Sequence, residues 1–375
     1  MSGVNLSNVG PSKKKPGVRG RRLPTGHSLL FYLCGVSLSL FECIAAAQTS
    51  DQLSSTPRPP DAQSEWKLFL GDFQQIGGTE VLIVRELKGK LYLLRPNREE
   101  LKLTRRDLNS FFYDGSHPDG KYVITFIQSH GIASSLLGPF GSYQRLRYEK
   151  SGTANAVIKT VRPVEELRAA AIAATPPAEN RTFRQPDLVE LAPLDPAIHL
   201  DIRYATPKDF LGVPVYTQAR AFLQRPAAEA LVRVLQKLKP FGYGLLIHDG
   251  YRPWYVTKIF WDATPPEGKV FVADPSQGSR HNRGCAADLT LYDLKTGQPI
   301  EMTGGYDEMS PRSFPNYLGG TSLQRWHRDL LRRAMESEGF TVYESEWWHF
   351  DYKDWREYGI LNVSFEKLGI GSAAK

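Results

Sequence analysis

The segment of residues 279–292, SRHNRGCAADLTLY, places an acidic side chain, Asp288, inside a run that otherwise reads as a β-strand. Carboxylates are unfavourable in half-buried strands, and a buried charge is costly unless it is paired or binds a metal ion. The fold must therefore supply a partner for Asp288. This requirement constrains the chain more than any other feature of its sequence.

His281 is the first candidate partner. Ala286, Asp288 and Thr290 alternate along the run and would share one face of a strand. A turn at residues 283–284, where a glycine stands, would bring His281 back toward that face. Imidazole and carboxylate could then bind one cation. Such pairs are also common by chance, so a site and a coincidence are both open at this point.

A second segment, EWWHF at residues 346–350, offers further groups. A catalytic zinc usually takes three protein ligands and keeps a fourth position for water, so one of Glu346 and His349 could bind metal while the other handles protons. Residues three apart point to opposite faces of a regular strand, so an extended segment needs a bulge or turn at residues 347–348. Alternatively, the two tryptophans are core and His349 is a polar neighbour.

The N-terminal segment resembles a secretory signal. Six basic residues precede an apolar run over residues 29–47, and three alanines precede Gln48. We therefore expect a signal peptide over residues 1–47 and an exported protein, periplasmic or secreted. The alternative is an uncleaved signal that anchors the chain in a membrane, because the apolar run is nearly long enough to span one.

Charge and cysteine content agree with export. The whole chain has a net charge of +7, but removal of residues 1–47 takes away six basic side chains and one acidic one and leaves about +2. This small charge gives no electrostatic basis for binding nucleic acid. Cys285 would be the one cysteine left in the mature chain, which excludes an intramolecular disulfide there.

At 375 residues the chain has room for two ordinary domains. Strand-like runs flank a turn at residues 88–89 and recur up to about residue 160, whereas helical and extended patterns alternate further on. His327, on a helix expected over residues 322–338, neighbours arginines and should be solvated. The expected domains are a flexible linker at 48–63, a small all-β accessory domain at 64–160, a linker at 161–186 and a second domain at 187–372.

The second domain resembles a known family. Ser279, His281, Gly284, Ala286 and Asp288 match the pattern S-x-H-x-x-G-x-A-x-D, and residues 346–349 match E-x-W-H, of zinc D-alanyl-D-alanine peptidases. Within that group the chain is most similar to the D-alanyl-D-alanine dipeptidases of the VanX type. The similarity covers residues 188–370 and includes DIRYAT at 201–206, DGYRP at 249–253 and GYDEMS at 305–310.

This resemblance implies an α+β catalytic domain with a mainly antiparallel sheet, flanking helices and a mononuclear zinc site. His281, Asp288 and His349 would hold the zinc, with Glu346 as general base and then proton donor to the leaving amine. Arg252 would stabilise the oxyanion. The alternative for Arg252 is a structural ion pair with a nearby carboxylate such as that of Asp249.

The implied substrate is a small dipeptide, D-alanyl-D-alanine, from cell-wall metabolism. Asp307 and Tyr204 would hold its ammonium end and Ser279 its carboxylate end. Trimming of peptidoglycan stems by a carboxypeptidase and a non-catalytic zinc or cell-wall binding module are the alternatives. Cys285 is expected to be a small buried residue rather than a ligand. The β domain lies outside the resemblance and could contact the cell wall, another protein or nothing.

Overall fold

The computed structural model describes residues 53, 56–114, 121–148 and 157–369. The predicted signal peptide and residues 48–52 and 54–55 of the predicted linker at 48–63 lie outside these ranges. In the described part of the chain, none of the helices is long and apolar enough to span a membrane.

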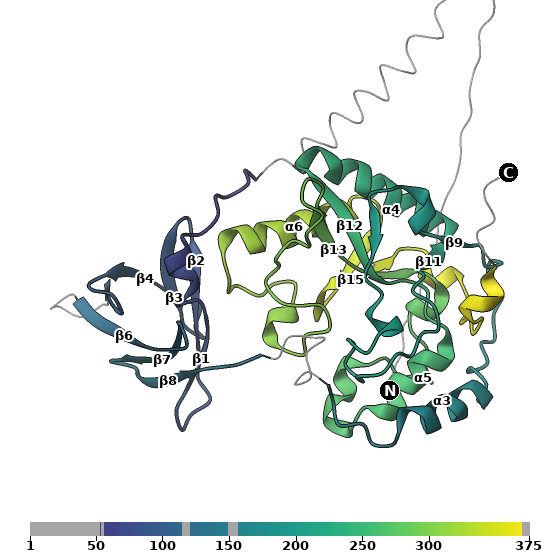
Figure 1. Ribbon diagram of the computed structural model, residues 1–375, viewed down its shortest axis with the longest axis horizontal. Helices are drawn as coiled ribbons and strands as arrows, with labels where there is room; N and C mark the ends of the chain where they lie inside the picture. The colour runs from purple at the N-terminus through teal and green to yellow at the C-terminus, as the bar shows by residue number, and fades with distance from the viewer. Residues whose placement is uncertain (1–52, 54–55, 115–120, 149–156, 370–375) are drawn as a thin grey trace, which may run out of the picture. The chain divides into compact units, whose positions relative to one another are not determined.

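Eight antiparallel strands within residues 64–160 form a closed barrel, in which each strand pairs with the next and β1 pairs with β8 (Figure 1). Alternate residues point inward and fill its interior, as Leu91 and Leu93 do on β3. The barrel elements are a short helix, α2 (Ser64–Lys67), and β1 (Gly71–Gln75), β2 (Val81–Leu87), β3 (Lys90–Leu94), β4 (Glu100–Arg105), β5 (Ser110–Asp114), β6 (Lys121–Ser129), β7 (Ile132–Gly138) and β8 (Gly141–Arg145).

The predicted turn at residues 88–89 is confirmed. Leu87 pairs with Lys90, and Lys88 and Gly89 both have positive φ, at 51° and 75°. Positive φ at both central residues is the geometry of a two-residue hairpin turn whose twist matches that of its strands.

A five-stranded sheet in the order β10-β12-β13-β15-β14 forms the centre of the second region, and all neighbours are antiparallel except β10 and β12. The mixed α+β architecture with a mainly antiparallel sheet is therefore confirmed. Its strands are β10 (Ile198–Leu200), β12 (Tyr243–Asp249), β13 (Ala286–Asp293), β14 (Phe340–Tyr343) and β15 (Glu346–Tyr352), and β9 (Leu188–Glu190) with β11 (Phe222–Gln224) forms a separate pair.

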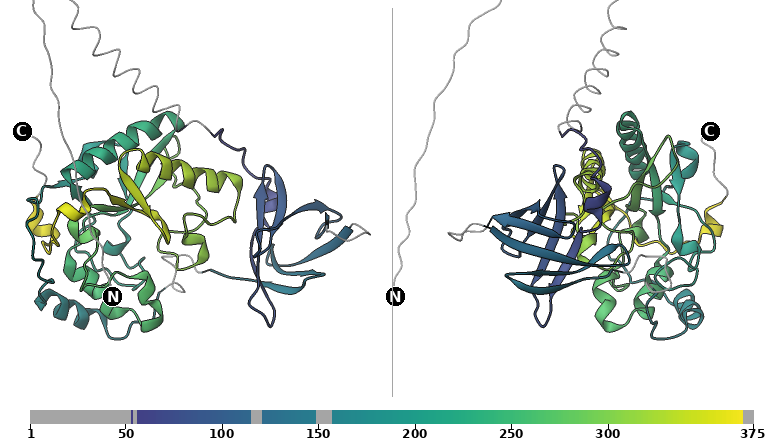
Figure 2. Two further views of the ribbon diagram at one scale, coloured as in Figure 1. Left: turned by 180° about the vertical axis from the view of Figure 1, so that it is seen from behind. Right: turned by 60° about the vertical axis from the view of Figure 1, so that its left-hand side comes forward.

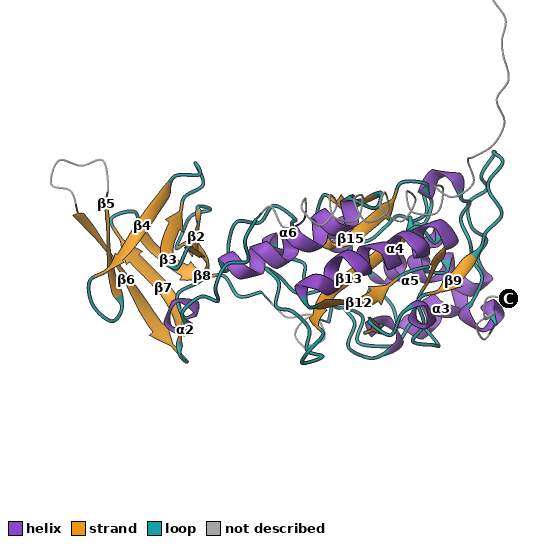
Figure 3. Ribbon diagram, turned by 90° about the horizontal axis from the view of Figure 1, so that it is seen from above, coloured by secondary structure: helices purple, strands orange, loops and turns teal. Residues whose placement is uncertain are grey.

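Helices cover this sheet on both sides: α4 and α6 pack against it on one side, and α5, with α3 packed on it, lies on the other (Figures 1, 2 and 3). Thr321 caps α6 through a capping box with Gln324. The helices are α3 (Val164–Ala173), α4 (Arg225–Leu238), α5 (Trp254–Ala263) and α6 (Ser322–Glu336). Short 3-10 turns are η2 (Ala192–Leu194), η3 (Arg203–Ala205), η4 (Lys239–Phe241), η5 (Pro266–Phe271), η6 (His281–Arg283), η7 (Pro311–Ser313), η8 (Trp355–Glu357) and η9 (Phe365–Leu368).

The segment expected to be a linker at 161–186 differs from that expectation. It contains α3, whose Leu167 and Ala171 are fully buried in the core around the sheet. Further on, Glu179 accepts hydrogen bonds from Arg283 and from the backbone of Ile360. The alanine-rich helix is packed because α5 offers it an apolar surface, which a local reading of the sequence could not reveal.

His327 is buried rather than solvated, and that prediction is wrong. The residue is 4 % exposed, and Nε2 lies 2.7 Å from the hydroxyl of Tyr243. Burial lowers the pKa of His327 to about 4, and the charge of Arg58 adds to the effect. The neighbouring arginines therefore do not mark a fully solvated face of α6.

The barrel is hydrogen-bonded to the loop that precedes α6 and to the first turn of that helix. Tyr317 donates to buried Asp72 of β1 at 2.5 Å, and the backbone N–H of Ser322 donates to Glu86 of β2 at 2.6 Å. Arg325 donates to the backbone carbonyl of Glu86 at 2.6 Å. Barrel and sheet belong to one compact unit with two separate apolar cores.

Candidate functional site

His281, Asp288 and His349 come together as the sequence predicts. Gly284, with φ at 68°, ends the turn that carries His281 and leads into β13, so the imidazole lies beside that strand. A Cβ at Gly284 would meet Leu188 at 2.6 Å, which also favours glycine there. His349 is directly opposite Asp288 in the pairing of β15 with β13.

The three candidate ligand atoms lie within hydrogen-bond distance of one another or just beyond it. His349 Nδ1 is 3.1 Å from Asp288 Oδ1, His281 Nε2 is 3.5 Å from the same oxygen, and the two nitrogens are 3.2 Å apart. Ligands of a tetrahedral zinc with bonds of about 2.0–2.1 Å would be about 3.4 Å apart. The spacing therefore fits one zinc ion.

Two hydrogen bonds behind the imidazoles determine which nitrogens face the centre. His281 Nδ1 donates to the carbonyl oxygen of Gly250 at 2.7 Å, and His349 Nε2 donates to Asp351 Oδ1 at 2.9 Å. In neutral rings the facing nitrogens are then both acceptors. Two lone pairs and a carboxylate oxygen converging at this distance repel one another unless a cation lies between them.

The electrostatics of the ligands favour such a cation. Burial alone would raise the pKa of Asp288, but the two imidazoles outweigh it and lower that pKa. Burial lowers the pKa of His349, yet the neighbouring carboxylates of Asp288 and Asp351 raise it to about 10. The neighbouring carboxylates therefore strongly stabilise positive charge beside His349.

Sequence reasoning missed Gly250 and Asp351 as partners of the ligands. Asp351 follows His349 by two residues on β15, so both side chains point to the same face of the strand, and this spacing was a usable signal. The carbonyl of Gly250 had no signal, because any residue carries one. Partners of this kind orient metal-binding imidazoles and raise their basicity.

Glu346 reaches the same centre through an irregularity in β15. Val342 pairs with Phe350, but the next residue of β14, Tyr343, pairs with Glu346, so the predicted break in regular pairing is present. Glu346 Oε2 is 3.7 Å from His349 Nδ1. Removal from bulk water raises the pKa of Glu346 to about 7, with Asp288 adding to the effect and His349 opposing it.

Arg252 is ion-paired with Asp249, as the structural alternative expects. Its Nη2 is 2.8 Å from Asp249 Oδ2 and 3.9 Å from Asp288 Oδ2. The guanidinium also lies over the ring of Tyr204, at 5.4 Å from the centroid. Asp249 thus holds the arginine against the candidate centre, so the structural pair and a role in the site are compatible.

A cavity of about 330 Å³ opens onto this centre, and all eight predicted site residues line it. Tyr204 donates to Asp307 at 2.9 Å across 103 positions of sequence, and burial, with the charge of Asp288, raises the pKa of Asp307. Ser279 is buried, and its hydroxyl accepts from the backbone N–H of His281 at 3.2 Å. The residues are Tyr204, Arg252, Ser279, His281, Asp288, Asp307, Glu346 and His349.

Tyr306 and Trp348 also belong to the surroundings of the site, and sequence reasoning did not select them. The Tyr306 hydroxyl donates to Asp288 Oδ2 at 3.3 Å, and its ring packs edge-on against Trp348, which lines the cavity. Cys285 is fully buried in the apolar core, and burial raises the pKa of its thiol. This environment agrees with a small packed residue rather than a ligand.

The cavity carries an excess of negative charge. Arg252 is balanced by Asp249, Arg280 by Asp351 and Glu308 by Arg312, and Asp274 also lines the cavity. Beside the two imidazoles stand the three carboxylates of Asp288, Asp307 and Glu346. A divalent cation together with one ammonium group would compensate these three charges. By charge, the cavity can therefore hold one divalent cation and one ammonium group.

Comparisons with known proteins agree with this geometry. A family model described as D-Ala-D-Ala dipeptidase matches residues 184–365 and leaves the barrel strands outside the match. The D-alanyl-D-alanine dipeptidase of Escherichia coli K12 is 35 % identical over 179 residues, which are 48 % of this chain and 91 % of the relative. The enzyme of the same name from Enterococcus faecium is 35 % identical over 185 residues, which cover 43 % of this chain and 90 % of the relative.

Proposed function

The chain belongs to the D-alanyl-D-alanine dipeptidase family of hydrolases, and from this premise we propose that it hydrolyses D-alanyl-D-alanine with one zinc ion. The main support for zinc is one observation. The facing nitrogens of His281 and His349 and a carboxylate oxygen of Asp288 lie 3.1–3.5 Å from one another. Asp288 Oδ1 is moreover buried without a hydrogen-bond partner among the described residues. An orphaned acceptor of this kind is typical of a metal ligand.

Zinc held by these three side chains would polarise the scissile carbonyl and make a water molecule more acidic. The chain's own contribution is to keep both imidazoles in the right tautomer through Gly250 and Asp351. Glu346 acts as the base that takes a proton from the attacking water and returns it to the leaving amine. Its raised pKa, about 7, suits both transfers near neutral pH.

Arg252 faces the place where the carbonyl oxygen would acquire negative charge. Arg252 is 8 % exposed and its guanidinium is already fixed by Asp249, so little reorganisation is needed when that charge develops. Its Nη2 is 3.9 Å from Asp288, one of the zinc ligands. We therefore assign Arg252 to the stabilisation of the oxyanion that forms when water attacks the carbonyl carbon.

Charge complementarity supports the dipeptide as substrate. The ammonium end would meet Asp307, which is buried and hydrogen-bonded by Tyr204. Its positive charge would offset the burial and the repulsion by Asp288 that raise the pKa of Asp307. The carboxylate end would lie near Ser279 and the positive side chains around it. Of these, Arg280 lines the cavity and is paired with Asp351 at 3.3 Å.

The test is release of D-alanine from D-alanyl-D-alanine by the purified chain supplied with zinc. We expect a chelator to abolish release and Glu346→Gln to lower kcat by about 10²–10⁴-fold. An intact dipeptide after long incubation with the zinc-loaded chain would contradict the function. Unchanged kcat in Glu346→Gln would contradict the assigned base and leave the function standing.

A pentapeptide stem tested in parallel separates the dipeptidase from a carboxypeptidase. Preference for the free dipeptide is expected if Asp307 binds its ammonium, because a stem has no free amine at that position. Faster release from the stem would assign the chain to peptidoglycan trimming instead.

The cellular setting is also a proposal. We infer that the chain is exported through residues 1–47 and works in cell-wall metabolism, with the barrel available for contact with the wall. Fractionation of cells that produce the tagged chain would test export, with recovery in the cytoplasm as the contradicting result.

A further inference from the structure

Asp307, which would hold the ammonium group of the substrate, has an unusual backbone conformation. Its φ is 55°, in the left-handed region that residues other than glycine, asparagine and aspartate rarely adopt. Within the described residues 157–369, every other residue with φ in this region is a glycine. Such a conformation persists only where its surroundings hold it, and it is concentrated at functional sites. The loop around Asp307 should therefore contain a group that fixes it.

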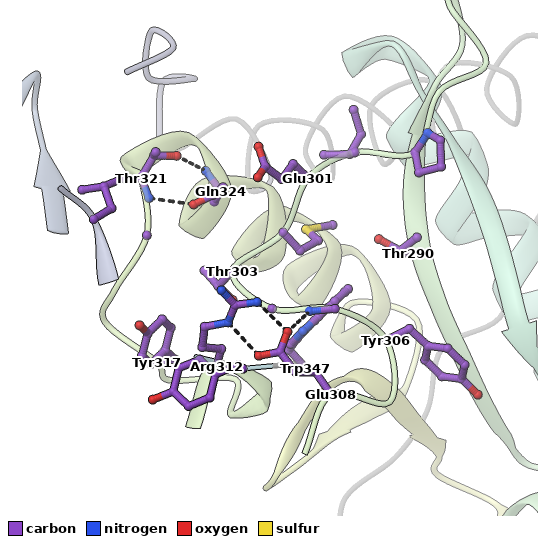
Figure 4. A pocket seen from close by; sticks show the side chains of 18 of the residues that line it. Thr290, Glu301, Thr303, Tyr306, Glu308, Arg312, Tyr317, Thr321, Gln324 and Trp347 are labelled. Atoms are coloured by element: carbon purple, nitrogen blue, oxygen red, sulfur yellow. Dashed lines mark hydrogen bonds and ion pairs between the residues drawn. The ribbon is translucent and has the colours of Figure 1, made fainter. Parts of the chain in front are cut away.

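The loop directs neighbouring side chains to different cavities. Asp307 lines the cavity of the candidate zinc site, where the hydroxyl of Tyr204 donates to its carboxylate at 2.9 Å. Tyr306, immediately before it, lines a second cavity together with Arg312 (Figure 4). A change of Asp307 to the right-handed region would redirect either its side chain or the flanking chain. The left-handed conformation therefore keeps the carboxylate beside Tyr204.

Glu308 is the group that holds this loop together. Its carboxylate accepts two hydrogen bonds from Arg312, both at 2.6 Å, and one from the backbone N–H of Gly305 at 2.9 Å (Figure 4). The hydroxyl of Ser310 donates to the same carboxylate, and the backbone N–H of Ser310 donates to the carbonyl oxygen of Glu308 at 2.9 Å. One residue is thus bonded to the chain on both sides of Asp307.

The hydrogen bonds to Glu308 are of a strong kind. Glu308 is 2 % exposed, and Arg312 meets its carboxylate with two N–H groups, which fixes the plane of the carboxylate. Burial alone would raise the pKa of Glu308, but the pairing with Arg312 outweighs burial and lowers that pKa. Both oxygens of Glu308 are therefore used within the loop, which leaves the carboxylate of Asp307 to meet a ligand.

We propose that Glu308 is a positioning residue for substrate recognition. Together with Arg312 it holds Asp307 in the left-handed conformation that directs the Asp307 carboxylate toward the ammonium group of the substrate. Glu308 acts through Asp307 and not on the substrate itself. The consequence is selectivity, because a carboxylate fixed in this place favours a ligand with a free amine over one without it. This inference rests on the proposed dipeptidase function and adds the device that sets its preference for a free dipeptide.

The test compares binding of D-alanyl-D-alanine with binding of N-propanoyl-D-alanine, the same molecule with hydrogen in place of the ammonium group. Calorimetry is carried out on the zinc-loaded full chain with Glu346→Gln, so that the dipeptide stays intact. Adding Glu308→Gln should weaken binding of the dipeptide about tenfold, since an amide cannot accept hydrogen bonds at both of its ends. Binding of the propanoyl compound should stay unchanged, whereas a general loss of structure would weaken both ligands.

Two further variants show where the change acts. Asp307→Asn removes the charge that binds the ammonium group, so adding Glu308→Gln to it should change the preference between the ligands no further. Glu338→Gln is the matched control. It also removes a paired carboxylate, bound to Arg233 and Lys237, but lies outside the lining of both cavities and should keep the preference.

An unchanged preference in Glu308→Gln overturns the proposal, as does a reference chain that binds the two ligands equally or binds neither. A further fall in the Asp307→Asn background would also overturn it, because Glu308 would then act by another route. If Glu308→Gln does not fold, Arg312→Lys, which keeps the charge but not the paired N–H groups, is judged by the same criteria. Release of D-alanine is measured separately in the chain that retains Glu346. A chain that prefers the free dipeptide without hydrolysing it would contradict the proposed function and support this inference.

Discussion

At the residue scale, the candidate zinc site depends on hydrogen bonds one step away from the ligands. Asp351 accepts from Nε2 of His349 and so turns Nδ1 of the same ring toward Asp288. Asp351 is also paired with Arg280 at 3.3 Å, which holds the carboxylate in place. The geometry of His349 is thus set by a residue that does not reach the metal position itself.

Asp351→Asn should weaken zinc binding by about 10–100-fold, because the amide holds the imidazole less firmly and makes it less basic. Competition with a chromogenic chelator measures the affinity. Asp329→Asn, on the exposed part of α6, is the matched control. Equal zinc affinity in Asp351→Asn and the parent chain would show that the hydrogen bond does not support the ligand.

His327 should make stability depend on pH. Its pKa is about 4 in the folded chain and about 6.5 when unfolded, so the unfolded state binds more protons between these values and stability falls as pH decreases through them. The loss should approach about 3 kcal/mol. Denaturant unfolding from pH 7 to 4 should be less pH-dependent in His327→Gln, whereas exposed His199→Gln should retain the parent slope. Parallel pH profiles of the parent and His327→Gln would refute this.

At the element scale, one turn and one irregular strand place the site. Gly284 reverses the chain between η6 and β13, and the break in pairing at Tyr343 turns Glu346 toward His349. Neither the turn at Gly284 nor the break in pairing at Tyr343 is regular secondary structure. Regular strands alone would keep His281 and Glu346 away from Asp288 and His349. Both are specified by local sequence and held by packing.

Gly284→Ala should destabilise the fold and weaken zinc binding, since alanine is strained at positive φ and its Cβ would clash with Leu188. Gly297→Ala is a sharp control, because Gly297 has nearly the same φ, 70°, with open space around its Cβ position. We expect thermal unfolding to show a loss of about 1 kcal/mol for Gly297→Ala and more for Gly284→Ala. Equal losses of stability in the two variants would mean that Leu188 moves away from the new Cβ at position 284 without a cost in free energy.

At the scale of the whole molecule, zinc and folding should be coupled. The ligands come from η6, β13 and β15, and they converge only when the sheet has formed. Binding to the folded chain alone therefore stabilises it, by about 2.7 kcal/mol at a free zinc concentration one hundred times Kd.

Calorimetry of the metal-free chain with increasing zinc should show a rising Tm, and Asp288→Asn should remove most of the increase. Glu346→Gln is the contrasting variant, since it keeps the three ligands and should retain the shift. A Tm independent of zinc in the parent chain would show that the three residues do not bind the ion.

The sequence by itself determined the local features of this protein. The hairpin at residues 88–89, the turn at residues 283–284 and the need for a partner at Asp288 follow from residue types at short spacing, where propensity and turn geometry act. Resemblance to the dipeptidase family also selected eight of the residues that line the cavity, and their individual roles are proposals. The hydrogen bond from His281 to the carbonyl oxygen of Gly250 could not be predicted, because a backbone carbonyl has no sequence signature.

Only the tertiary structure decided what depends on contacts between distant segments. It buried α3 against α5, placed His327 against Tyr243 and closed the barrel through β1 and β8. Burial and hydrogen-bond satisfaction belong to the assembled surfaces, since each element supplies only half of such a contact. For that reason the neighbouring arginines gave a wrong prediction of solvent exposure for His327. At Gly284 the local sequence was sufficient to predict the turn.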